Sequence, residues 1–450
     1  MIYVVAMVAA IAGFLFGFDE GVIAGALAPL KAEFAISPLV EGMMTAAVPL
    51  GALAGALVAG RLAAPVGRRG LLLAAAGLFV AGALGAALST GVAMLTAVRV
   101  VLGAAIGVAA MIAPLYISES APAARRGMFV SIYQLAITLG IVGAYLVGWV
   151  AADAWRVMFA VGMVPGLALF FGMRALPDTP RWLIQTGRMR QARTTIARLR
   201  GERPDHPAVT ADLVAIRDAV TADRGGGGLA GLTSPMVRPA LVVAMGLFLL
   251  QQLSGINAVI YYAPQVFGLA GFDSATGQLL ATIGIGVVNV AMTLVGMALI
   301  DRIGRRRLLL LGFAGTAASL AVIAVAAAVG TADLGAVALA GLVVYIASFA
   351  VAVGPLPWVM MSEVFPLAVR GPGMSLAQVT NWAANFLVVL TFPVIVGAIG
   401  LAGVFALYAA VCVAGVAFTL RLVPETKGVP LEVIEAHLRG GKPLRDLKAA

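Results

Sequence analysis

Two residues of opposite charge, Asp19 and Arg99, stand inside apolar stretches of a chain in which only 11% of the residues are charged. A charge at membrane depth is costly unless it is paired or hydrated, so we expect these two side chains to pair. The carboxylate can lose its charge by taking up one proton, and loss of its basic partner would favour that step. The alternative is a static ion pair that only fixes two helices to each other.

A second group consists of uncharged amide side chains inside apolar stretches. Amides both donate and accept hydrogen bonds, which suits a neutral ligand covered in hydroxyl groups. Two tryptophans add flat apolar faces on which the C–H face of a sugar ring can pack. Each single amide can equally bond a neighbouring helix, but the set together favours a polar neutral ligand. The amides are Gln134, Gln251, Gln252, Asn257, Asn289 and Asn381, and the tryptophans are Trp358 and Trp382.

The elements that must position these residues are apolar stretches long enough to cross a membrane. With 62% hydrophobic residues and a mean hydropathy of +1.04, the chain is expected to be a polytopic membrane protein, because soluble domains carry about 25% charged residues. A helix of roughly 20 apolar residues spans the hydrocarbon core. Such stretches lie at approximately 3–27, 42–63, 70–89, 94–118, 128–150, 156–176, 238–268, 275–299, 306–329, 336–361, 372–397 and 401–423.

Charged motifs at the ends of these stretches recur in the two halves of the chain. Glu119-x-x-Pro-x-x-x-Arg126-Gly returns as Glu363-x-x-Pro-x-x-x-Arg370-Gly, and a Gly-Arg-Arg triplet occurs in both halves. Duplicated bundles with matching polar residues at one face are a common construction of transporters. Ion pairs there can latch the bundles when an inner gate closes, unless the arginines serve only as topology signals. The predicted cytoplasmic gate consists of Arg68, Glu119, Arg126, Asp301, Arg305, Glu363 and Arg370.

These patterns predict an all-α membrane protein with twelve transmembrane helices in two pseudo-symmetric six-helix bundles. The predicted parts are an N-terminal bundle (1–176), a cytoplasmic helical linker (177–236), a C-terminal bundle (237–424) and a cytoplasmic tail (425–450). Nearly all lysines and arginines fall in even-numbered loops or tails, which predicts that both termini face the cytoplasm. The exceptions are Lys31, Arg99 and Arg156.

Several other functions are excluded by the same composition. The net charge of +10 is explained by topology signals, so no nucleic-acid partner is expected. A single cysteine, Cys412, allows neither an internal disulfide nor a cysteine metal site. No constellation of residues points to a metal, a cofactor or an enzyme, and the expected partners are a small ligand, protons and the lipid bilayer.

A set of specific motifs covers nearly the whole chain: Gly17-Phe-Asp19, Arg99 followed by Pro114-x-Tyr-x-x-Glu119, Pro177 to Trp182, Gln251-Gln-Leu-Ser-Gly-Ile-Asn257, Gly354-Pro-Leu-Pro-Trp358, Asn381-Trp382 and Pro424 to Gly428. Together they resemble the sugar porter family of the major facilitator superfamily. Within that family the chain is most similar to bacterial galactose–proton and arabinose–proton symporters.

The resemblance implies proton-coupled uptake of a neutral monosaccharide of galactose, glucose, arabinose or xylose type, by alternating access. It further implies a bacterial inner-membrane location and a monomeric carrier, with Asp19 as the proton-carrying residue and Arg99 as its partner. The six amides and Trp358 correspond to sugar-contacting positions. The residues that line the same cavity by resemblance are Phe16, Tyr261, Gly354 and Trp382. A passive facilitator and a non-transporting membrane sugar sensor remain as alternatives.

Two positions depart from the family pattern. Ala64 stands before the first Gly-Arg-Arg triplet where the family usually has an aspartate, whereas the second copy keeps Asp301. This change weakens the latch hypothesis for the first half. Glu20 is an unexpected charge beside Asp19, points about 100° away from it on a helix, and has no assigned role.

Overall fold

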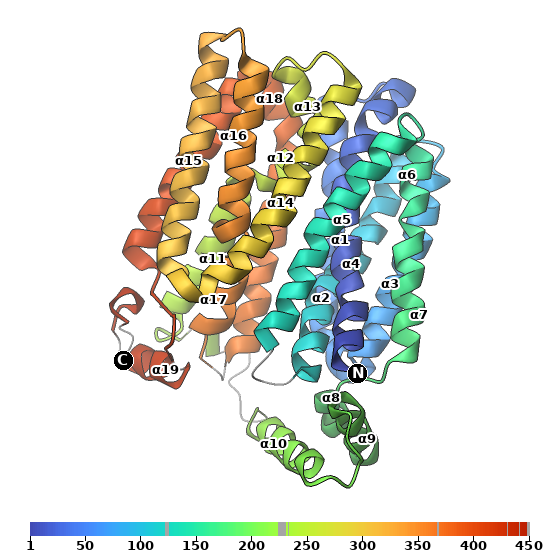
Figure 1. Cartoon of the computed structure of the whole chain (residues 1–450), viewed down its shortest axis with the longest axis vertical. Helices are drawn as coiled ribbons and strands as arrows, with labels where there is room; N and C mark the ends of the chain where they lie inside the picture. Colours follow the sequence, from blue (N-terminus) through green and yellow to red (C-terminus); the bar gives the residue numbers. More distant parts are fainter. Residues whose placement is uncertain are drawn as a thin grey trace. The chain divides into compact units, whose positions relative to one another are not determined.

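The chain folds into helices, several of them interrupted (Figure 1). The computed structural model describes residues 1–121, 126–223, 231–232, 234–366, 369–429, 431–440 and 442–447, and this part contains no strand. The helices of its first half are α1 (Ile2–Phe34), α2 (Pro38–Val66), α3 (Arg68–Ala87), α4 (Val92–Ser120), α5 (Arg126–Ala151), α6 (Trp155–Val161), α7 (Met163–Ala175), α8 (Pro180–Gln185), α9 (Met189–Arg200) and α10 (Pro207–Asp223).

The second half repeats long helices but breaks them more often. Its elements are α11 (Arg238–Leu253), α12 (Ile256–Tyr261), α13 (Ala263–Leu269), α14 (Ala275–Ile303), α15 (Arg305–Val329), α16 (Leu334–Ser348), the π-helix η3 (Phe349–Val353), α17 (Leu356–Val364), α18 (Arg370–Leu422), α19 (Leu431–Arg439) and the 3-10 helix η5 (Leu444–Asp446).

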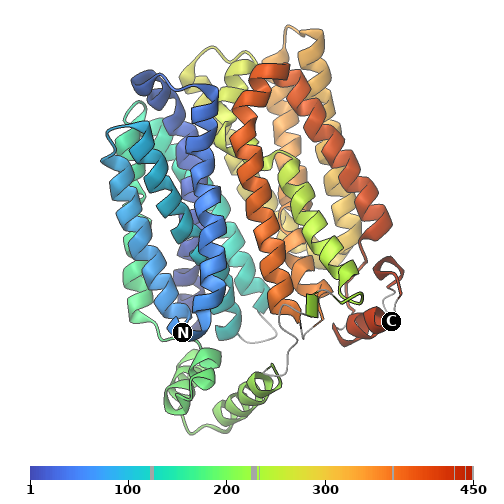
Figure 2. The ribbon, with the colours of Figure 1, turned by 180° about the vertical axis from the view of Figure 1, so that it is seen from behind.

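The predicted membrane spans are confirmed by the helices. Among the described residues, eleven helical segments are long and apolar enough to cross a membrane. The last of them, α18, has 53 residues, which would be about 80 Å if straight. Its backbone leaves the helical conformation at Gly400, and Figure 2 shows the two limbs of α18, in orange and red, turning back on each other there. The two limbs bring the number of spans to twelve.

Contacts divide the chain into two compact units. Unit 1 comprises Met1–Asp19, Ala47–Gly140 and Arg156–Gly226, and unit 2 comprises Glu20–Ala46, Ile141–Trp155 and Gly227–Ala450. The boundaries pass through α1, α2 and α5, so the later part of α1 belongs with the helices of the second half. The predicted division of the chain at 177–236 stays a prediction.

In unit 1, small residues let two membrane helices approach backbone to backbone. A Cβ atom placed on Gly103 or Gly107 of α4 would lie 2.1 Å from a carbonyl oxygen of α2, and one on Gly51 of α2 would lie 2.0 Å from a carbonyl of α4. Such spacing of glycines gives helix association in membranes through close packing. Helix α3 packs against α4 and α7, which completes this group.

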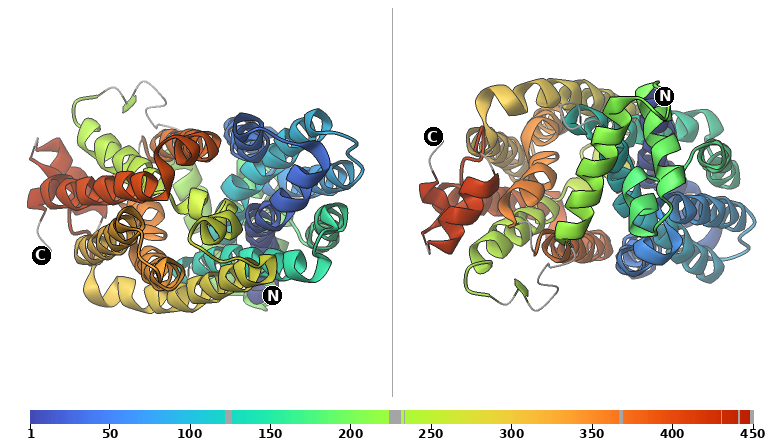
Figure 3. Two further views of the ribbon diagram at one scale, coloured as in Figure 1. Left: turned by 90° about the horizontal axis from the view of Figure 1, so that it is seen from above. Right: turned by 90° about the horizontal axis from the view of Figure 1, so that it is seen from below.

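The short helices α8, α9 and α10 of unit 1 pack on one another and carry a small core of their own. Trp182 and Leu183 of α8 contact Ala192 of α9 and Val220 of α10. These helices appear in green in the right-hand view of Figure 3. The sequence prediction of short helices in this connection is therefore confirmed.

In unit 2, α15 packs against both α16 and α18, and α11 packs against α18. The early part of α2 packs against α18 and the later part of α5 packs against α14, in each case at a glycine, while Gly21 of α1 packs against α5. Gly42 of α2 meets the backbone of Leu390 on α18, and Gly286 of α14 meets the ring of Tyr145 on α5. Unit 2 therefore contains the interruptions at Gly255, η3 and Gly400 together with parts of α1, α2 and α5.

Gly103 provides a direct test of the close packing in unit 1. Replacement of Gly103 by Ala forces α2 and α4 apart, because the new methyl group meets backbone atoms that cannot rotate away. We expect a loss of about 1–3 kcal/mol, seen as a lower melting temperature of the purified protein. Gly284→Ala is the matched control, since a Cβ at Gly284 meets nothing within 4 Å and alanine favours a helix. Equal melting temperatures of the two variants would contradict the packing.

Candidate functional site

Asp19 and Arg99 form the buried pair that the sequence predicts. The Asp19 side chain is 3% exposed and that of Arg99 is 0% exposed, and Oδ2 of Asp19 lies 3.8 Å from Nη2 of Arg99. This separation is longer than a hydrogen bond, and Oδ2 makes none with the described residues. The guanidinium also lies 5.7 Å from the ring centre of Phe159. The charges therefore attract each other without a tight hydrogen bond, so they can separate without breaking one.

Glu20 has a partner of its own. Its Oε1 accepts a hydrogen bond from the Tyr261 hydroxyl at 3.3 Å, and the side chain is buried. Tyr145 interacts electrostatically with Glu20. Its hydroxyl donates a hydrogen bond to the carbonyl of Ile260 at 3.0 Å. Two successive carboxylates of α1 thus face different sets of residues.

The break between α11 and α12 creates the polar centre of unit 2. The chain turns at Gly255 with φ +90°, a conformation that glycine adopts at no steric cost. A second interruption, the π-helix η3 followed by Gly354 and Pro355, loosens backbone carbonyls on another element. Nε2 of Gln251 donates to the carbonyls of Val353 at 2.9 Å and Gly354 at 2.7 Å. Gln251 therefore joins the two interruptions.

Three other amides form a continuous chain of hydrogen bonds, here called the amide cluster. Gln252 donates from Nε2 to Oδ1 of Asn381 at 2.7 Å, and Asn257 donates from Nδ2 to Oε1 of Gln252 at 2.7 Å. All three side chains are nearly completely buried. The cluster connects α11, α12 and α18 and orients each amide, so its remaining donors and acceptors have fixed directions.

The other predicted sugar-site residues lie in both units. Trp382, next to Asn381 on α18, and Tyr261 are each 1% exposed, and Asn289 of α14 is also buried. Trp358 is half-buried and packs edge to face on Phe248, with ring centres 4.8 Å apart. The predicted residues of unit 1 are Gln134 and Phe16, both half-buried. The structure therefore connects Gln252, Asn257 and Asn381 directly by hydrogen bonds.

Asn385 is a candidate that the sequence reasoning did not select. It lies one turn after Asn381 on α18 and is 1% exposed, and its Oδ1 has no hydrogen-bond partner among the described residues. A buried amide oxygen without a donor is costly, so it marks a place where a ligand or water can donate. The only available signal was its i, i+4 spacing from Asn381.

Carboxylates of α1 and α2 make a further set of contacts in unit 2. Oε2 of Glu41 accepts from Lys31 at 2.9 Å, and Oε1 of the same side chain accepts from Gln265 of α13. Nε1 of Trp155 donates to Glu33 at 2.7 Å. Sequence reasoning noted Lys31 only as an exception to the charge pattern, because partners from α13 cannot be recognised without the fold.

The repeated motifs build one network in unit 1. Nη2 of Arg68 lies 2.8 Å from Oε1 of Glu119, and Thr179 donates to Oε2 of the same carboxylate at 2.6 Å. The backbone N–H groups of Arg68 and Arg69 donate to Asp178 at 3.2 Å each. Burial raises the pKa of Asp178, although these backbone hydrogen bonds and the charge of Arg68 act in the opposite direction.

Unit 2 contains the equivalent network. Nη2 of Arg305 lies 3.0 Å from Oε1 of Glu363, and Thr426 donates to the other oxygen of that carboxylate. The backbone N–H groups of Arg305 and Arg306 donate to Glu425 at 2.9 and 3.1 Å. The same three-way contact of arginine, glutamate and threonine therefore occurs in both sequence halves.

The remaining predicted gate residues make fewer or weaker contacts in the structure. Asp301 pairs with Arg305 at 2.9 Å, although its side chain is 82% exposed. Nη2 of Arg370 lies 3.4 Å from the carbonyl of Phe365. The Arg126 side chain lies outside the described residues. Each ion pair described here stays within a single unit, and the assignment of these residues to a gate stays a prediction.

Comparison with known proteins finds transporters of sugars and related compounds. The family described as "Sugar (and other) transporter" matches residues 5–438. The galactose-proton symporter of Escherichia coli (strain K12) is 40% identical over 453 residues, covering 100% of this chain and 97% of the symporter. The D-xylose transporter of Levilactobacillus brevis is 38% identical over 435 residues, covering 96% of this chain and 94% of that protein.

Solved structures agree with these relatives. The xylose transporter XylE from E. coli, in an inward open conformation, matches with a TM-score of 0.83 and 30% identity, and the match covers 97% of this chain and 99% of XylE. A structure of the proton:xylose symporter XylE bound to 6-bromo-6-deoxy-D-glucose matches with a TM-score of 0.81 and 31% identity over 97% and 98% of the two chains. The predicted fold, that of the major facilitator superfamily, is confirmed.

Gln252 provides the test of the amide cluster. Gln252→Leu leaves Oδ1 of Asn381 and Nδ2 of Asn257 buried without their observed partner, at a cost of about 1–3 kcal/mol for each unpaired group. We expect a clear fall in the melting temperature of the purified protein. Thr380→Ala is the control, because Thr380 is only half-buried and its side chain bonds, among the described residues, to a carbonyl of its own helix.

A double-mutant cycle sharpens this test. Asn257→Leu in the Gln252→Leu background should cost less than Asn257→Leu alone, since the shared hydrogen bond is already absent. Additive losses would show that the two amides act independently and would refute the cluster.

Proposed function

Because the chain belongs to the family of sugar (and other) transporters, we propose that it carries a neutral monosaccharide into the cell together with a proton. The curated relatives that are 37–40% identical include symporters of galactose and arabinose with protons. The protein is a carrier in this proposal and makes or breaks no covalent bond. Galactose, glucose, arabinose and xylose are the candidate substrates.

The observation that carries proton coupling is the Asp19–Arg99 pair. Both side chains are nearly completely buried, and their 3.8 Å separation is not held by a hydrogen bond of normal length. Uptake of a proton by Asp19 removes its charge and releases Arg99, which favours the sugar-loaded carrier. Deprotonation toward the cytoplasm restores the pair. The membrane potential supplies about 2.3 kcal/mol per charge and 100 mV to this cycle.

The sugar site of this proposal is centred on the amide cluster. Amides held by one another offer directed donors and acceptors to sugar hydroxyls, and Trp382 offers an adjacent apolar face. Gln251 has a supporting role, since its amide nitrogen holds the backbone at Val353 and Gly354. Asn385 adds a buried acceptor one turn from Asn381. The remaining proposed contacts are Phe16, Gln134, Tyr261, Asn289 and Trp358.

The proposed location is a bacterial inner membrane with both termini in the cytoplasm, where the carrier acts as a monomer. The distribution of lysine and arginine over loops and tails supports this orientation. The repeated networks around Glu119 and Glu363 then lie at the cytoplasmic ends of the helices and belong to the inner gate.

A passive sugar facilitator and a membrane sugar sensor are the alternatives. A facilitator needs no titratable residue inside the membrane, so the buried Asp19 favours the symporter. A sensor would bind sugar but would not exchange labelled for unlabelled sugar across a membrane.

Asp19→Asn tests proton coupling directly. In proteoliposomes with an imposed pH gradient, the parent should accumulate labelled sugar, whereas the variant should only equilibrate it, because asparagine cannot take up the proton. Exchange of labelled for unlabelled sugar without a gradient should persist in the variant. Asp273→Asn, which changes an exposed loop carboxylate, is the control and should accumulate sugar normally. Accumulation by Asp19→Asn would exclude Asp19 as the coupling residue.

Glu363→Gln tests the gate. The variant keeps the shape of the side chain but weakens its pairing with Arg305. Because Glu363 makes no hydrogen bond to the amide cluster among the described residues, we expect a lower maximal uptake rate with an unchanged concentration for half-maximal uptake. Asp301→Asn is the control, since that partner of Arg305 is largely solvated. An equal effect of both variants on the rate would contradict the gate assignment.

A further inference from the structure

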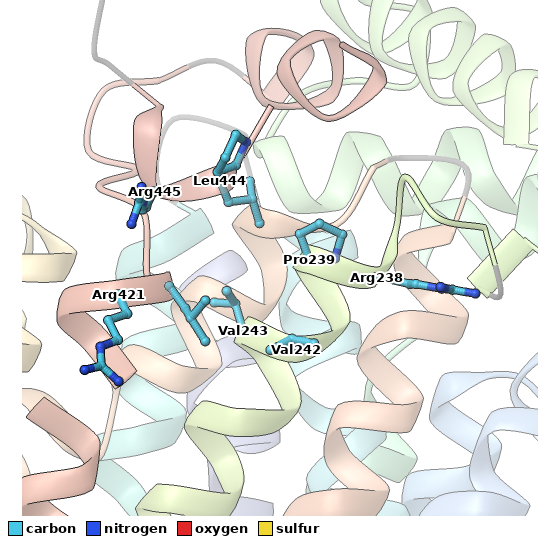
Figure 4. Close-up of a pocket in the computed structure, with 9 residues that line it drawn as sticks. Arg238, Pro239, Val242, Val243, Arg421, Leu444 and Arg445 are labelled. Atoms are coloured by element: carbon cyan, nitrogen blue, oxygen red, sulfur yellow. The ribbon is translucent and has the colours of Figure 1, made fainter. Parts of the chain in front are cut away.

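A pocket at one end of unit 2 has no place in sugar or proton handling. Its volume is about 480 Å³, and it forms where α11 begins, where α18 ends and where η5 of the tail lies against them. None of its lining residues belongs to the amide cluster or to the network of Arg305. Figure 4 shows Arg421 and Arg445 at one side of the pocket, Pro239 and Val243 in the middle, and Arg238 at the other side.

The charge of this pocket is entirely positive. Arg238, Arg421 and Arg445 line it, and none of the described lining residues is acidic. Within the described part of the chain, the side chains of Arg238 and Arg421 have neither a hydrogen bond nor an ion pair. Arg445 has only a 3.4 Å contact with its neighbour Asp446, in which both side chains are more than half exposed, so that pair is weak. The pocket thus offers guanidinium groups that are free to bind an anion.

The remaining walls are apolar and lie at the ends of two spans. Arg238 is the first residue of the span Arg238–Tyr261, and Leu422 is the last residue of the span Arg370–Leu422. Val242 is 50% exposed and Leu422 is 42% exposed. Because spans end where hydrocarbon meets headgroups, the arginines lie at headgroup level and the exposed apolar side chains lie beside the first carbons of the acyl chains.

We propose that this pocket binds an anionic phospholipid of the phosphatidylglycerol class. The guanidinium group of Arg421 hydrogen-bonds the phosphate oxygens, for which the planar donor fork of arginine is well suited. Arg238, on the opposite side of the pocket, adds a longer-range attraction for the anionic headgroup. An acyl chain of the same lipid covers Val242 and Leu422. The bound lipid joins the start of α11 and the end of α18 to the tail segment at Leu444.

The arginines and the apolar wall of the pocket together favour this lipid over related ligands. A zwitterionic headgroup carries an ammonium that three arginines repel, so phosphatidylethanolamine binds less well. A free phosphate or a sugar phosphate would use the arginines but would leave the apolar wall uncovered. Only an anionic lipid uses both the charge and the apolar surface.

The test measures lipid binding by the purified, delipidated full-length protein. Its melting temperature is recorded in detergent against increasing phosphatidylglycerol, phosphatidylethanolamine or sodium phosphate at equal ionic strength. We expect saturable stabilisation by phosphatidylglycerol, a smaller shift with phosphatidylethanolamine and none with phosphate. In the double variant Arg238→Gln/Arg421→Gln, the phosphatidylglycerol concentration for half-maximal stabilisation should rise about tenfold or more, as expected for loss of a charge-assisted hydrogen bond.

Two further variants separate the pocket from other surfaces. Arg307→Gln removes an exposed arginine at the start of α15, outside the pocket, and should leave lipid stabilisation unchanged. Val242→Ser changes only the exposed apolar wall and should weaken phosphatidylglycerol binding severalfold. Without lipid, all variants should melt close to the parent, because the substituted side chains are exposed.

Each other outcome overturns the proposal in a specific way. Equal stabilisation by phosphate would identify a site for soluble anions, and equal stabilisation by phosphatidylethanolamine would show unselective lipid contact. Unchanged binding in the double arginine variant would place the lipid elsewhere. None of these results depends on sugar transport, so this proposal and the proposed function can fail separately.

Discussion

A helix that breaks inside an apolar span exposes backbone groups that hydrocarbon cannot satisfy, and the candidate site depends on how this chain meets that constraint. Within the described part of unit 2, the breaks beside the candidate site are those at Ser254–Gly255 and around Gly354. At the second break, Nε2 of Gln251 satisfies the backbone by donating to the carbonyls of Gly354 at 2.7 Å and Val353 at 2.9 Å. The hydroxyl of Tyr345 supports the first by donating to the carbonyl of Ser254 at 3.0 Å. The breaks therefore determine where polar side chains are needed, and one of these side chains, Gln251, also belongs to the proposed sugar site.

The two halves of the chain share the same hydrogen-bond networks at the ends of their helices, but they differ in the middle of the helices. In each half, a glycine with positive φ lets two backbone N–H groups point at one carboxylate, Asp178 in the first half and Glu425 in the second. An arginine then reaches the glutamate of the recurring motif in both halves. Ala64 shows that the aspartate missing from the first copy is not required for this geometry, because Arg68 pairs with Glu119 without it. In the middle of the helices the halves differ, with a charged pair in one and connected amides in the other.

The sequence was sufficient for the spans, the repeats and the Asp19–Arg99 pair, because length, hydropathy and the cost of an isolated charge are local properties. It could not distinguish the roles of neighbouring amides. Gln251 and Gln252 are adjacent and chemically identical, yet one supports backbone and the other joins Asn257 to Asn381. Contacts such as that of Glu41 with Gln265 could not be predicted from the sequence either. They depend on how α2 approaches α13, and no spacing along the chain records that approach.

The proposed coupling between proton and sugar has a short physical route through α1. Asp19 faces Arg99, and the next residue, Glu20, accepts a hydrogen bond from Tyr261. Tyr261 lies one helical turn after Asn257 and on the same face of α12. Because successive residues of a helix differ in direction by about 100°, one turn of α1 presents one carboxylate to the ion pair and the other to the segment that bears the amide cluster. The proton-handling residue and the residue that contacts Tyr261 are therefore neighbours joined by one peptide bond of α1, so the proposed coupling needs no long pathway between the two sites.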